Sequence, residues 1–385
     1  MLTGKTILVI SPQRWGNMYL SKHHYAIELA KRGNTVYFLN PPDETARAKR
    51  GRIAVAEEGN MPGLWVIDHS LRFPYQLKFH AMSLFHLLMR PHVAAILKKI
   101  GRPVDVIWSF DLGNLYPFRF FGKTPCKIFH PVDEPLNAAA IRSGDGAQIV
   151  FAVTREILAK YEHLGVPGHF INHGVSAGFV GEGLQPWVKR TPVRVGLSGN
   201  WTRPDIDTGC LLRIVRSQPS VVFEFWGSYR MTDSNIGGSA DQQMEDFVGE
   251  LKAAPNVVLH GPVPNGRLAT ELQRMDAFLI CYDIQKDQSK GTNYHKVMEY
   301  LSTGKVIVSS NITTYSDRPQ LVQMTRERDN NDRLPELFAR VIGDIGQYNT
   351  DELRQERYAY AFNNTYKKQL ERIDALLEKK EYVRQ

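Results

Sequence analysis

Short apolar segments alternate with helical segments from the start of the chain, and this order restricts the fold more than any other feature. Residues 5–10 have the pattern of a buried strand, residues 21–32 that of a helix ended by Gly33, and residues 35–39 that of a second strand. A strand, a glycine-containing loop, a helix and a strand in this order form a βαβ unit, which requires a parallel sheet. The loop lacks the GxGxxG pattern of dinucleotide-binding folds, so an NAD site is not predicted.

The same order of elements returns in the second half of the chain. A segment rich in Gly, Pro and charge at 181–192 has the composition of a linker. We therefore predict an α/β protein of two Rossmann-like domains, the first at 1–180 and the second at 193–350. A long charged helix is expected at 351–385, and the length of 385 residues is sufficient for two cores.

One stretch of the second domain, residues 291–308, has the features of a phosphate site. A loop of small residues opens a short helix, and a Gly-Lys turn leads into an apolar strand. A helix N-terminus presents backbone N–H groups and partial positive charge to an anion. Lys296 can add a full charge, and Glu299 can accept hydrogen bonds from two sugar hydroxyls. The alternative is an amphipathic helix whose Lys and Glu are solvated.

This stretch resembles the nucleotide-sugar-dependent glycosyltransferases of the GT-B fold, whose donor domain carries a small-residue loop, Lys-x-x-Glu-Tyr-Leu, a glycine turn and an apolar strand. The resemblance implies two Rossmann-like domains that face a central cleft, with a C-terminal helix that crosses back to the first domain. Retaining members often carry a second Glu eight residues before the first, and here that position is Gly291. The resemblance implies donor-binding roles for Gly199, Asn200, Gly261, Val263, Tyr282, Thr292, Asn293, His295, Lys296 and Glu299.

Residues at the ends of first-domain strands are candidates for the acceptor side and for catalysis. Ligands of open α/β sheets bind at the carboxyl ends of strands, where the sequence places His130, Asp133, Glu134 and His173. The order of elements here resembles the xanthan-type glucuronosyltransferases, which implies that Asp133 is the general base that deprotonates the acceptor hydroxyl. Glu134 competes for this role because it is adjacent and chemically equivalent. The structural alternative is that Asp133 caps the following helix.

The first loop of the chain adds three candidates on the acceptor side, Arg14, Gly16 and Asn17. In the resembling family this loop approaches the acceptor. The alternative for Gly16 is that the turn itself needs a glycine.

A second acidic motif, Asp205-Ile206-Asp207, matches the Asp-x-Asp pattern of metal-dependent glycosyltransferases. The two-domain order of strands and helices contradicts that other fold, so Asp207 is predicted to be a helix N-cap. We expect no metal, because Lys296 and the helix N-terminus can neutralise a leaving diphosphate.

The residues and the resemblance together predict a metal-independent, hexosyltransferase-type glycosyltransferase. It would move a sugar from a nucleoside-diphosphate sugar, with UDP favoured over GDP, to a hydroxyl of a saccharide or lipid-linked saccharide in cell-surface polysaccharide or glycoconjugate synthesis. The nucleotide sugar is a co-substrate, and no cofactor is expected. The alternatives are a nucleotide-sugar 2-epimerase of the same fold and a non-catalytic sugar-nucleotide-binding module. The sequence leaves the donor sugar, the acceptor and the anomeric outcome open.

The composition is typical of a cytoplasmic enzyme that can touch a membrane. Apolar residues make up 43% and charged residues 23% of the chain, and no apolar run approaches the roughly 20 residues that span a bilayer. Three widely spaced cysteines are predicted to be free thiols. The net charge of +8 favours anionic partners. The basic, aromatic stretch 74–100 either lies on an anionic membrane or covers the core, and no nucleic-acid partner is predicted.

Overall fold

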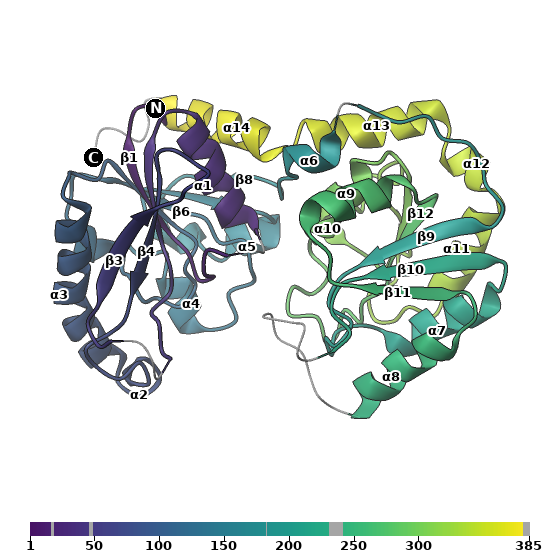
Figure 1. The fold of residues 1–385 in the computed structure, drawn as a ribbon, viewed down its shortest axis with the longest axis horizontal. Helices are drawn as coiled ribbons and strands as arrows, with labels where there is room; N and C mark the ends of the chain where they lie inside the picture. Colours follow the sequence, from purple (N-terminus) through teal and green to yellow (C-terminus); the bar gives the residue numbers. More distant parts are fainter. Residues whose placement is uncertain (17–18, 46–48, 182, 231–241, 380–385) are drawn as a thin grey trace. The chain divides into compact units, whose positions relative to one another are not determined.

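The computed structural model describes residues 1–16, 19–45, 49–181, 183–230 and 242–379. The chain divides into two compact units, which are described separately (Figure 1). Unit 1 consists of Met1–Asn172 and the chain from Tyr366, and unit 2 consists of His173–Thr365. Each unit is built on one mainly parallel sheet with helices, as the alternation of strands and helices predicted.

The first boundary between the two units lies between Asn172 and His173, which is before the predicted linker at 181–192. Helix α6 (Ala177–Val180) packs on two helices of unit 2, α9 (Asn265–Gln273) and α13 (Asp351–Phe362). The backbone N–H of Val175 also donates to the carbonyl of Asn364 at 3.1 Å. These contacts explain why the segment from His173 to the end of α6 belongs to unit 2.

Unit 1 contains a sheet of eight strands in the order β3-β4-β2-β1-β5-β6-β7-β8. Among the described strands of this sheet, only the edge strand β3 runs antiparallel to its neighbour. The strands are β1 (Thr6–Ile10), β2 (Thr35–Leu39), β3 (Ile53–Glu57), β4 (Leu64–His69), β5 (Val106–Ser109), β6 (Cys126–Phe129), β7 (Ile149–Ala152) and β8 (Gly168–Phe170). The helices of unit 1 are α1 (Ser21–Lys31), α2 (Leu77–His80), α3 (Met82–Ile100), α4 (Ala138–Arg142), α5 (Arg155–Ala159) and α14 (Tyr366–Glu378), with short 3₁₀ turns at Phe118–Phe121 and Glu162–Leu164.

The central strands of unit 1 are buried on both faces, which accounts for their continuous apolar sequences. Strand β1 pairs with β2 on one side, where Ile7 lies opposite Val36, and with β5 on the other, where Ile7 lies opposite Val106. The chain order reverses between these two neighbours of β1. In open α/β sheets such a switch point is where ligands bind, at the carboxyl ends of the strands. The loop after β1 and His130 after β6 follow strands at this part of the sheet.

The basic, aromatic stretch 74–100 folds mainly as two helices, α2 and α3, with a break between them. The break lies at Ala81, whose backbone is not helical (φ −150°, ψ 65°), and Pro91 lies inside α3. A helix restarted after Ala81 can bury the apolar residues that recur along one of its faces. These are Phe85, Met89, Val93, Ile96 and Ile100. Strand β3 was not predicted, because its half-exposed sequence with two alanines gives a weak strand signal.

Unit 2 contains a sheet of six strands in the order β11-β10-β9-β12-β13-β14, and its described pairs are parallel. The strands are β9 (Val193–Ser198), β10 (Val221–Trp226), β11 (Val257–Gly261), β12 (Ala277–Ile280), β13 (Val306–Ser309) and β14 (Gln323–Met324). Besides α6, α9 and α13, its helices are α7 (Thr208–Ser217), α8 (Gln242–Ala253), α10 (Lys296–Leu301), α11 (Leu334–Gly343) and α12 (Ile345–Tyr348), with a 3₁₀ turn at Thr313–Tyr315.

The switch point of unit 2 lies between β9 and β12. Strand β9 pairs with β10 along its length and with β12 at Val195, which lies opposite Ala277. The stretch predicted as loop, short helix, glycine turn and strand folds in that order as α10 and β13. Gly304 forms the turn with a left-handed φ of +75°, where a side chain would also meet the Arg354 carbonyl at 2.9 Å.

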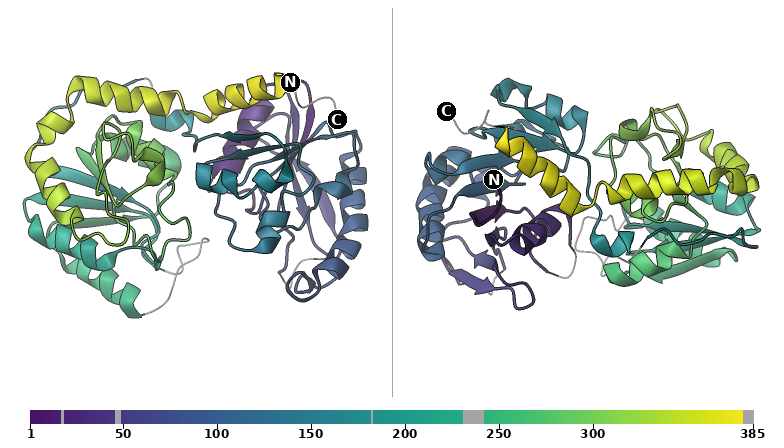
Figure 2. Two further views of the ribbon diagram at one scale, coloured as in Figure 1. Left: turned by 180° about the vertical axis from the view of Figure 1, so that it is seen from behind. Right: turned by 90° about the horizontal axis from the view of Figure 1, so that it is seen from above.

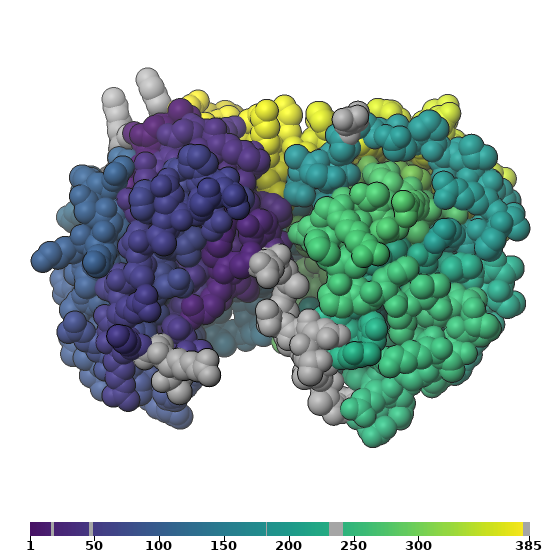
Figure 3. Space-filling view, viewed as in Figure 1, coloured from purple at the N-terminus to yellow at the C-terminus, as the bar shows by residue number. Residues whose placement is uncertain are grey.

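The long C-terminal helix predicted from 351 is two helices, α13 and α14, with a break between them (Figure 2). The amide of Asn364 donates to the Tyr360 carbonyl at 2.7 Å, a side-chain bond that competes with helix continuation. Within unit 1, α14 packs on α1, and the N-terminal ammonium of Met1 pairs with Asp374 at 2.9 Å. The space-filling view accordingly shows the start of the chain beside α14 (Figure 3).

Candidate functional site

Lys296 is the central cation of the candidate site in unit 2. It opens α10, and its Nζ donates to the carbonyl of Ser198 at 2.5 Å and to the hydroxyl of Tyr282 at 2.7 Å. Burial disfavours the ammonium, but the neighbouring Tyr282 and Tyr300 oxygens outweigh this effect, so the pKa of Lys296 is raised. A permanently charged group is therefore fixed at the carboxyl ends of β9 and β12, where the sheet has its switch point.

Three glycines at successive strand ends make room for this arrangement. The N–H of Gly199 donates to the Trp226 carbonyl at 3.0 Å, and that of Gly227 donates to the Gly261 carbonyl at 2.9 Å. A Cβ on Gly199 would lie 2.9 Å from Lys296 Nζ, and one on Gly227 would lie 1.8 Å from the Gly199 carbonyl oxygen. Gly199 and Gly261 were predicted as donor residues, whereas Gly227 was missed because its constraint comes from the backbone of another loop.

Glu299 and two histidines form a second group close to Lys296 on the same helix. Glu299 accepts from His295 at 3.2 Å, and the His173 ring packs edge-on against His295 with centroids 5.7 Å apart. The second oxygen of Glu299 has no hydrogen-bond partner among the described residues and can accept from a ligand hydroxyl. His173 was predicted on the acceptor side, but the structure places it in unit 2 beside predicted donor residues.

The loop before α10 is organised by Asp287, which the sequence analysis did not single out. Its carboxylate accepts from the Gly291 N–H at 2.9 Å, the Tyr294 hydroxyl at 2.7 Å and the Ser289 hydroxyl at 2.5 Å. The Thr292 carbonyl accepts from the backbone N–H of residue 314 at 3.1 Å. Thr292 and its neighbour Asn293 are buried. The small-residue loop is thus a fixed structure that sets the start of α10.

Arg203 is a further cation near this site that was not predicted. It forms an ion pair with Asp205, which raises its pKa against the opposing effect of burial, and it also lies in electrostatic range of Tyr282 and Lys296. The preceding loop is held by Asn200, whose Oδ1 accepts from the Thr202 hydroxyl at 2.8 Å. A cation in the loop after β9 was the signal in the sequence that could have identified Arg203.

The other predicted donor residues occupy the rim of the same sheet edge. Tyr282 packs on Tyr294 with ring centroids 4.7 Å apart. Gly261 ends β11 with a φ of +74°, and Val263 follows it, partly buried against a hydrophobic cluster. The structure therefore brings Gly199, Tyr282 and Lys296 into direct contact, and connects Gly261 to them through Gly227.

The two acidic candidates of unit 1 differ in their surroundings. Glu134 forms an ion pair with Lys160, whereas Asp133 is exposed and has no hydrogen-bond or ion-pair partner among the described residues. The cap of α4 is Asn137, whose side chain accepts from the N–H of Ala140 at 3.0 Å, so Asp133 does not cap that helix. Asp133 is therefore the carboxylate that remains available to a ligand.

The first loop contributes Arg14 and Gly16, while Asn17 lies outside the described residues. Arg14 pairs with Asp68 at 3.4 Å and with Asp43 at 3.7 Å. A Cβ on Gly16 would meet nothing within 4 Å, and its φ is not left-handed, so the turn does not require this glycine.

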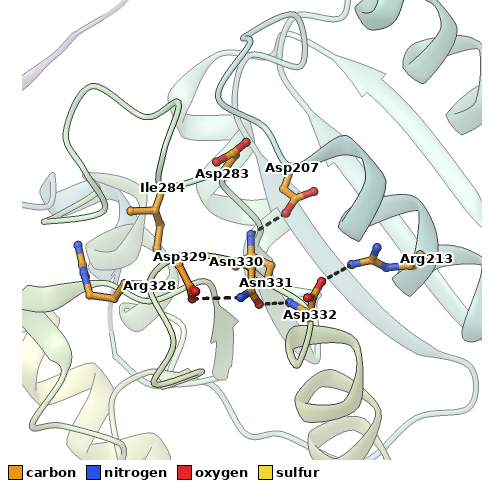
Figure 4. A pocket seen from close by; sticks show the side chains of 9 residues that line it. All are labelled: Asp207, Arg213, Asp283, Ile284, Arg328, Asp329, Asn330, Asn331 and Asp332. Carbon is orange, nitrogen blue, oxygen red and sulfur yellow. Dashed lines mark hydrogen bonds and ion pairs between the residues drawn. The ribbon is translucent and has the colours of Figure 1, made fainter.

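A polar hollow of about 210 Å³ lies in unit 2, and the residues that line it include none of the predicted donor residues (Figure 4). It is lined by Asp207, Arg213, Asp283, Ile284 and residues 328–332. Asp207 is the N-cap of α7, as predicted, because its side chain accepts from the Cys210 N–H at 2.9 Å. Figure 4 shows Asn331 reaching Asp207, and its amide also donates to the Tyr282 carbonyl at 2.9 Å. The hollow is thus connected to the Lys296 site through the backbone of Tyr282.

Two Rossmann-like units with these sheet orders constitute the GT-B fold of glycosyltransferases, and comparison with solved structures confirms that fold. Sucrose-phosphate synthase from Thermosynechococcus elongatus matches with a TM-score of 0.71 and 12% identity, over 97% of this chain and 99% of that chain. The UDP-forming trehalose-phosphate synthase from Burkholderia xenovorans, solved with glucose-6-phosphate, matches with a TM-score of 0.66 and 14% identity, over 97% and 100%. The Anabaena protein HepE, solved with UDP and glucose, gives 0.66 and 13% over 97% and 100%.

At such identities the likeness establishes the fold alone. No family model matches the sequence, and no curated protein matches it at a significant level. Among the described residues, no helix combines the length and the apolar character that a membrane span requires.

Proposed function

We propose that the protein is a glycosyltransferase that moves a sugar from a nucleoside-diphosphate sugar, with UDP favoured over GDP, to a hydroxyl of a saccharide acceptor. The observation that carries the proposal is the Lys296 ammonium, fixed by Ser198 and Tyr282 at the switch point of unit 2. The solved proteins that share the fold include enzymes described as UDP-forming or solved with UDP. They support the transferase over the epimerase of the same fold.

The residues of unit 2 provide the two contacts that a nucleoside diphosphate needs. Lys296, with Arg203 in electrostatic range, supplies positive charge for the diphosphate. The Gly199 loop lets backbone approach the phosphates without a side chain in between. Glu299 accepts hydrogen bonds from the ribose hydroxyls. Together, the contacts to the phosphates and to the ribose hold the diphosphate leaving group in place while negative charge develops on it during transfer.

Asp133 is the general base in this proposal. It is exposed, and no hydrogen bond or ion pair occupies its carboxylate among the described residues. A carboxylate that accepts the acceptor's hydroxyl proton typically contributes about 10²–10⁴-fold to the rate. Glu134 is a poorer candidate because its carboxylate already forms an ion pair with Lys160. The chemistry requires no metal in this scheme, since Lys296 neutralises the leaving diphosphate, and activity in excess chelator tests that point.

We place the acceptor on a lipid carrier for cell-surface polysaccharide or glycoconjugate synthesis, and the enzyme in the cytoplasm at the inner face of the membrane. Phe79 and Leu87, on α2 and α3, are 69% and 68% exposed, and Lys78 and Arg90 lie close to them in sequence. Apolar groups among cations suit an anionic interface. Replacing both apolar residues by serine should reduce co-sedimentation with phosphatidylglycerol vesicles. An unchanged bound fraction would contradict this placement.

The donor site is tested by thermal stabilisation with UDP, GDP and ADP. A ligand that binds only the folded state raises the melting temperature according to its concentration relative to Kd. We expect UDP to stabilise the wild type and to lose its effect on Lys296→Met and Glu299→Gln. Lys286→Met is the matched control, because Lys286 is a half-exposed cation paired with Asp283 in the adjacent loop. If no diphosphate stabilises the wild type, the proposed function is wrong.

A further inference from the structure

A lysine is buried in unit 1 with no hydrogen-bond or ion-pair partner among the described residues. Lys22 lies in the first turn of α1, and only 2% of it is exposed. A buried ammonium is unfavourable unless an anion compensates for its lost hydration. Burial accordingly lowers the pKa of Lys22, and the Asp133 carboxylate opposes that shift. Asp133 is exposed and forms no direct ion pair with the ammonium, so the compensation is incomplete.

His130 is a second donor without a partner in the part of the chain that the structure describes, and through Tyr25 it packs against α1, the helix that carries Lys22. Its ring is fully buried and packs against Phe110 and Tyr25, with centroids 5.0 and 5.2 Å apart. Nδ1 accepts from the indole N–H of Trp108 at 3.4 Å, so Nε2 carries the proton of the neutral ring. Burial, and then the charge of Lys22, lower the pKa of His130 to about 3, which keeps the ring neutral. Nε2 has no hydrogen-bond partner among the described residues.

Both groups can donate hydrogen bonds, and Lys22 carries a charge in its protonated form, which burial disfavours. A ligand hydroxyl would satisfy the His130 N–H but would leave the Lys22 charge without a counter-charge. A carboxylate or a phosphate satisfies both, because its oxygens accept several hydrogen bonds and carry the opposite charge. The position of Lys22 in the first turn of α1 adds the partial positive charge of the helix start.

We infer that Lys22 and His130 form a subsite for an anionic group, a carboxylate or a phosphate, on the saccharide that unit 1 binds. The inference rests on the proposed function only in taking that ligand to be a saccharide. It narrows the substrate class to acidic or phosphorylated sugars. It also assigns Lys22 a role in specificity, while Asp133 remains the base.

The test is titration calorimetry of the full-length protein with glucuronate, glucose 6-phosphate and glucose. We expect at least one of the two acidic sugars to bind the wild type about tenfold or more tightly than glucose, the effect of a charge-assisted contact. Lys22→Met should abolish this preference. Lys31→Met is the matched control and should retain it, because Lys31 lies exposed on the same helix in an ion pair with Glu28. The preferred sugar distinguishes a carboxylate from a phosphate.

Several outcomes would overturn the inference. These are equal affinity of the wild type for glucose and both acidic sugars, no binding of any of the three, and a preference that survives Lys22→Met. Methionine has a similar length and buries no charge, so Lys22→Met should melt no earlier than the wild type. If it does not fold, Lys22→Gln is used with the same expected loss. Stabilisation by UDP, GDP and ADP is measured in parallel: if none of the three stabilises the wild type, the proposed function is refuted, whereas an acid preference in that case leaves the subsite standing.

Discussion

Replacing Gly199 by alanine should weaken diphosphate binding while leaving unit 2 folded. The new Cβ would lie 2.9 Å from Lys296 Nζ and 3.7 Å from the Tyr282 hydroxyl. The backbone of Gly199 tolerates alanine because its φ is not left-handed. The flexible end of Lys296 must therefore move, which separates it from the Ser198 carbonyl, 2.5 Å away in the wild type. Loss of one charge-assisted contact to a phosphate costs about 1.5–3 kcal/mol, or roughly 10- to 150-fold in Kd.

The assay is titration of UDP into the wild type, Gly199→Ala and two comparison variants. Gly249 lies inside α8 with nothing within 4 Å of an added Cβ, so Gly249→Ala should bind UDP normally and gain about 0.5–1 kcal/mol of stability. Gly227→Ala should instead destabilise the unit, because its Cβ would meet the rigid Gly199 carbonyl at 1.8 Å and its φ is +111°. Wild-type affinity for UDP in Gly199→Ala would refute the assignment of Lys296 as the diphosphate ligand.

Two further predictions concern unit 1. Asp133→Asn should lower kcat by about 10²–10⁴-fold in a UDP-release assay, and Glu134→Gln should have a much smaller effect; comparable losses would leave the base unassigned. Burial lowers the pKa values of His69 and His130 to about 3, below the ordinary value of about 6.5, so the folded state binds fewer protons than the unfolded state. The stabilisation that these two neutral histidines contribute should therefore be complete above about pH 6.5 and fall as the pH drops toward 3. Urea unfolding at pH 7, 5.5 and 4.5 measures this effect. A midpoint that stays constant across these pH values would contradict the prediction.

The fold was predictable because parallel strands buried on both faces have continuous apolar sequences that stand out between helices. Helix α10 and strand β13 show this most clearly. Lys296 begins the helix, a glycine turn follows it, and the apolar run of β13 comes next. The break at Ala81 carries no such mark, because alanine is a strong helix former and only the packing of α3 on the sheet reveals it. The break between α13 and α14 was marked only weakly by Asn-Asn-Thr.

The arrangement of the candidate site could be predicted where one local motif carries it and not where distant backbones meet. Lys296 and Glu299 share a helix turn, so a pattern of a few residues identifies both. The need for glycine at 227 arises partly from the carbonyl of Gly199, in the loop after β9, and the local sequence around Gly227 gives no sign of that close approach. The sequence alone did not reveal the contact of His173 with His295, because it joins segments that are far apart in the chain.

The missing second glutamate of the donor loop has a reason in the backbone. Gly291 adopts a left-handed φ of +64°, and a Cβ there would lie 2.8 Å from the Asn311 carbonyl oxygen. Its N–H is bound by Asp287 at 2.9 Å, which fixes this conformation. A glutamate at 291 would be strained and would collide with backbone that cannot yield. The departure from the paired-glutamate pattern therefore goes with a loop geometry that requires glycine at 291.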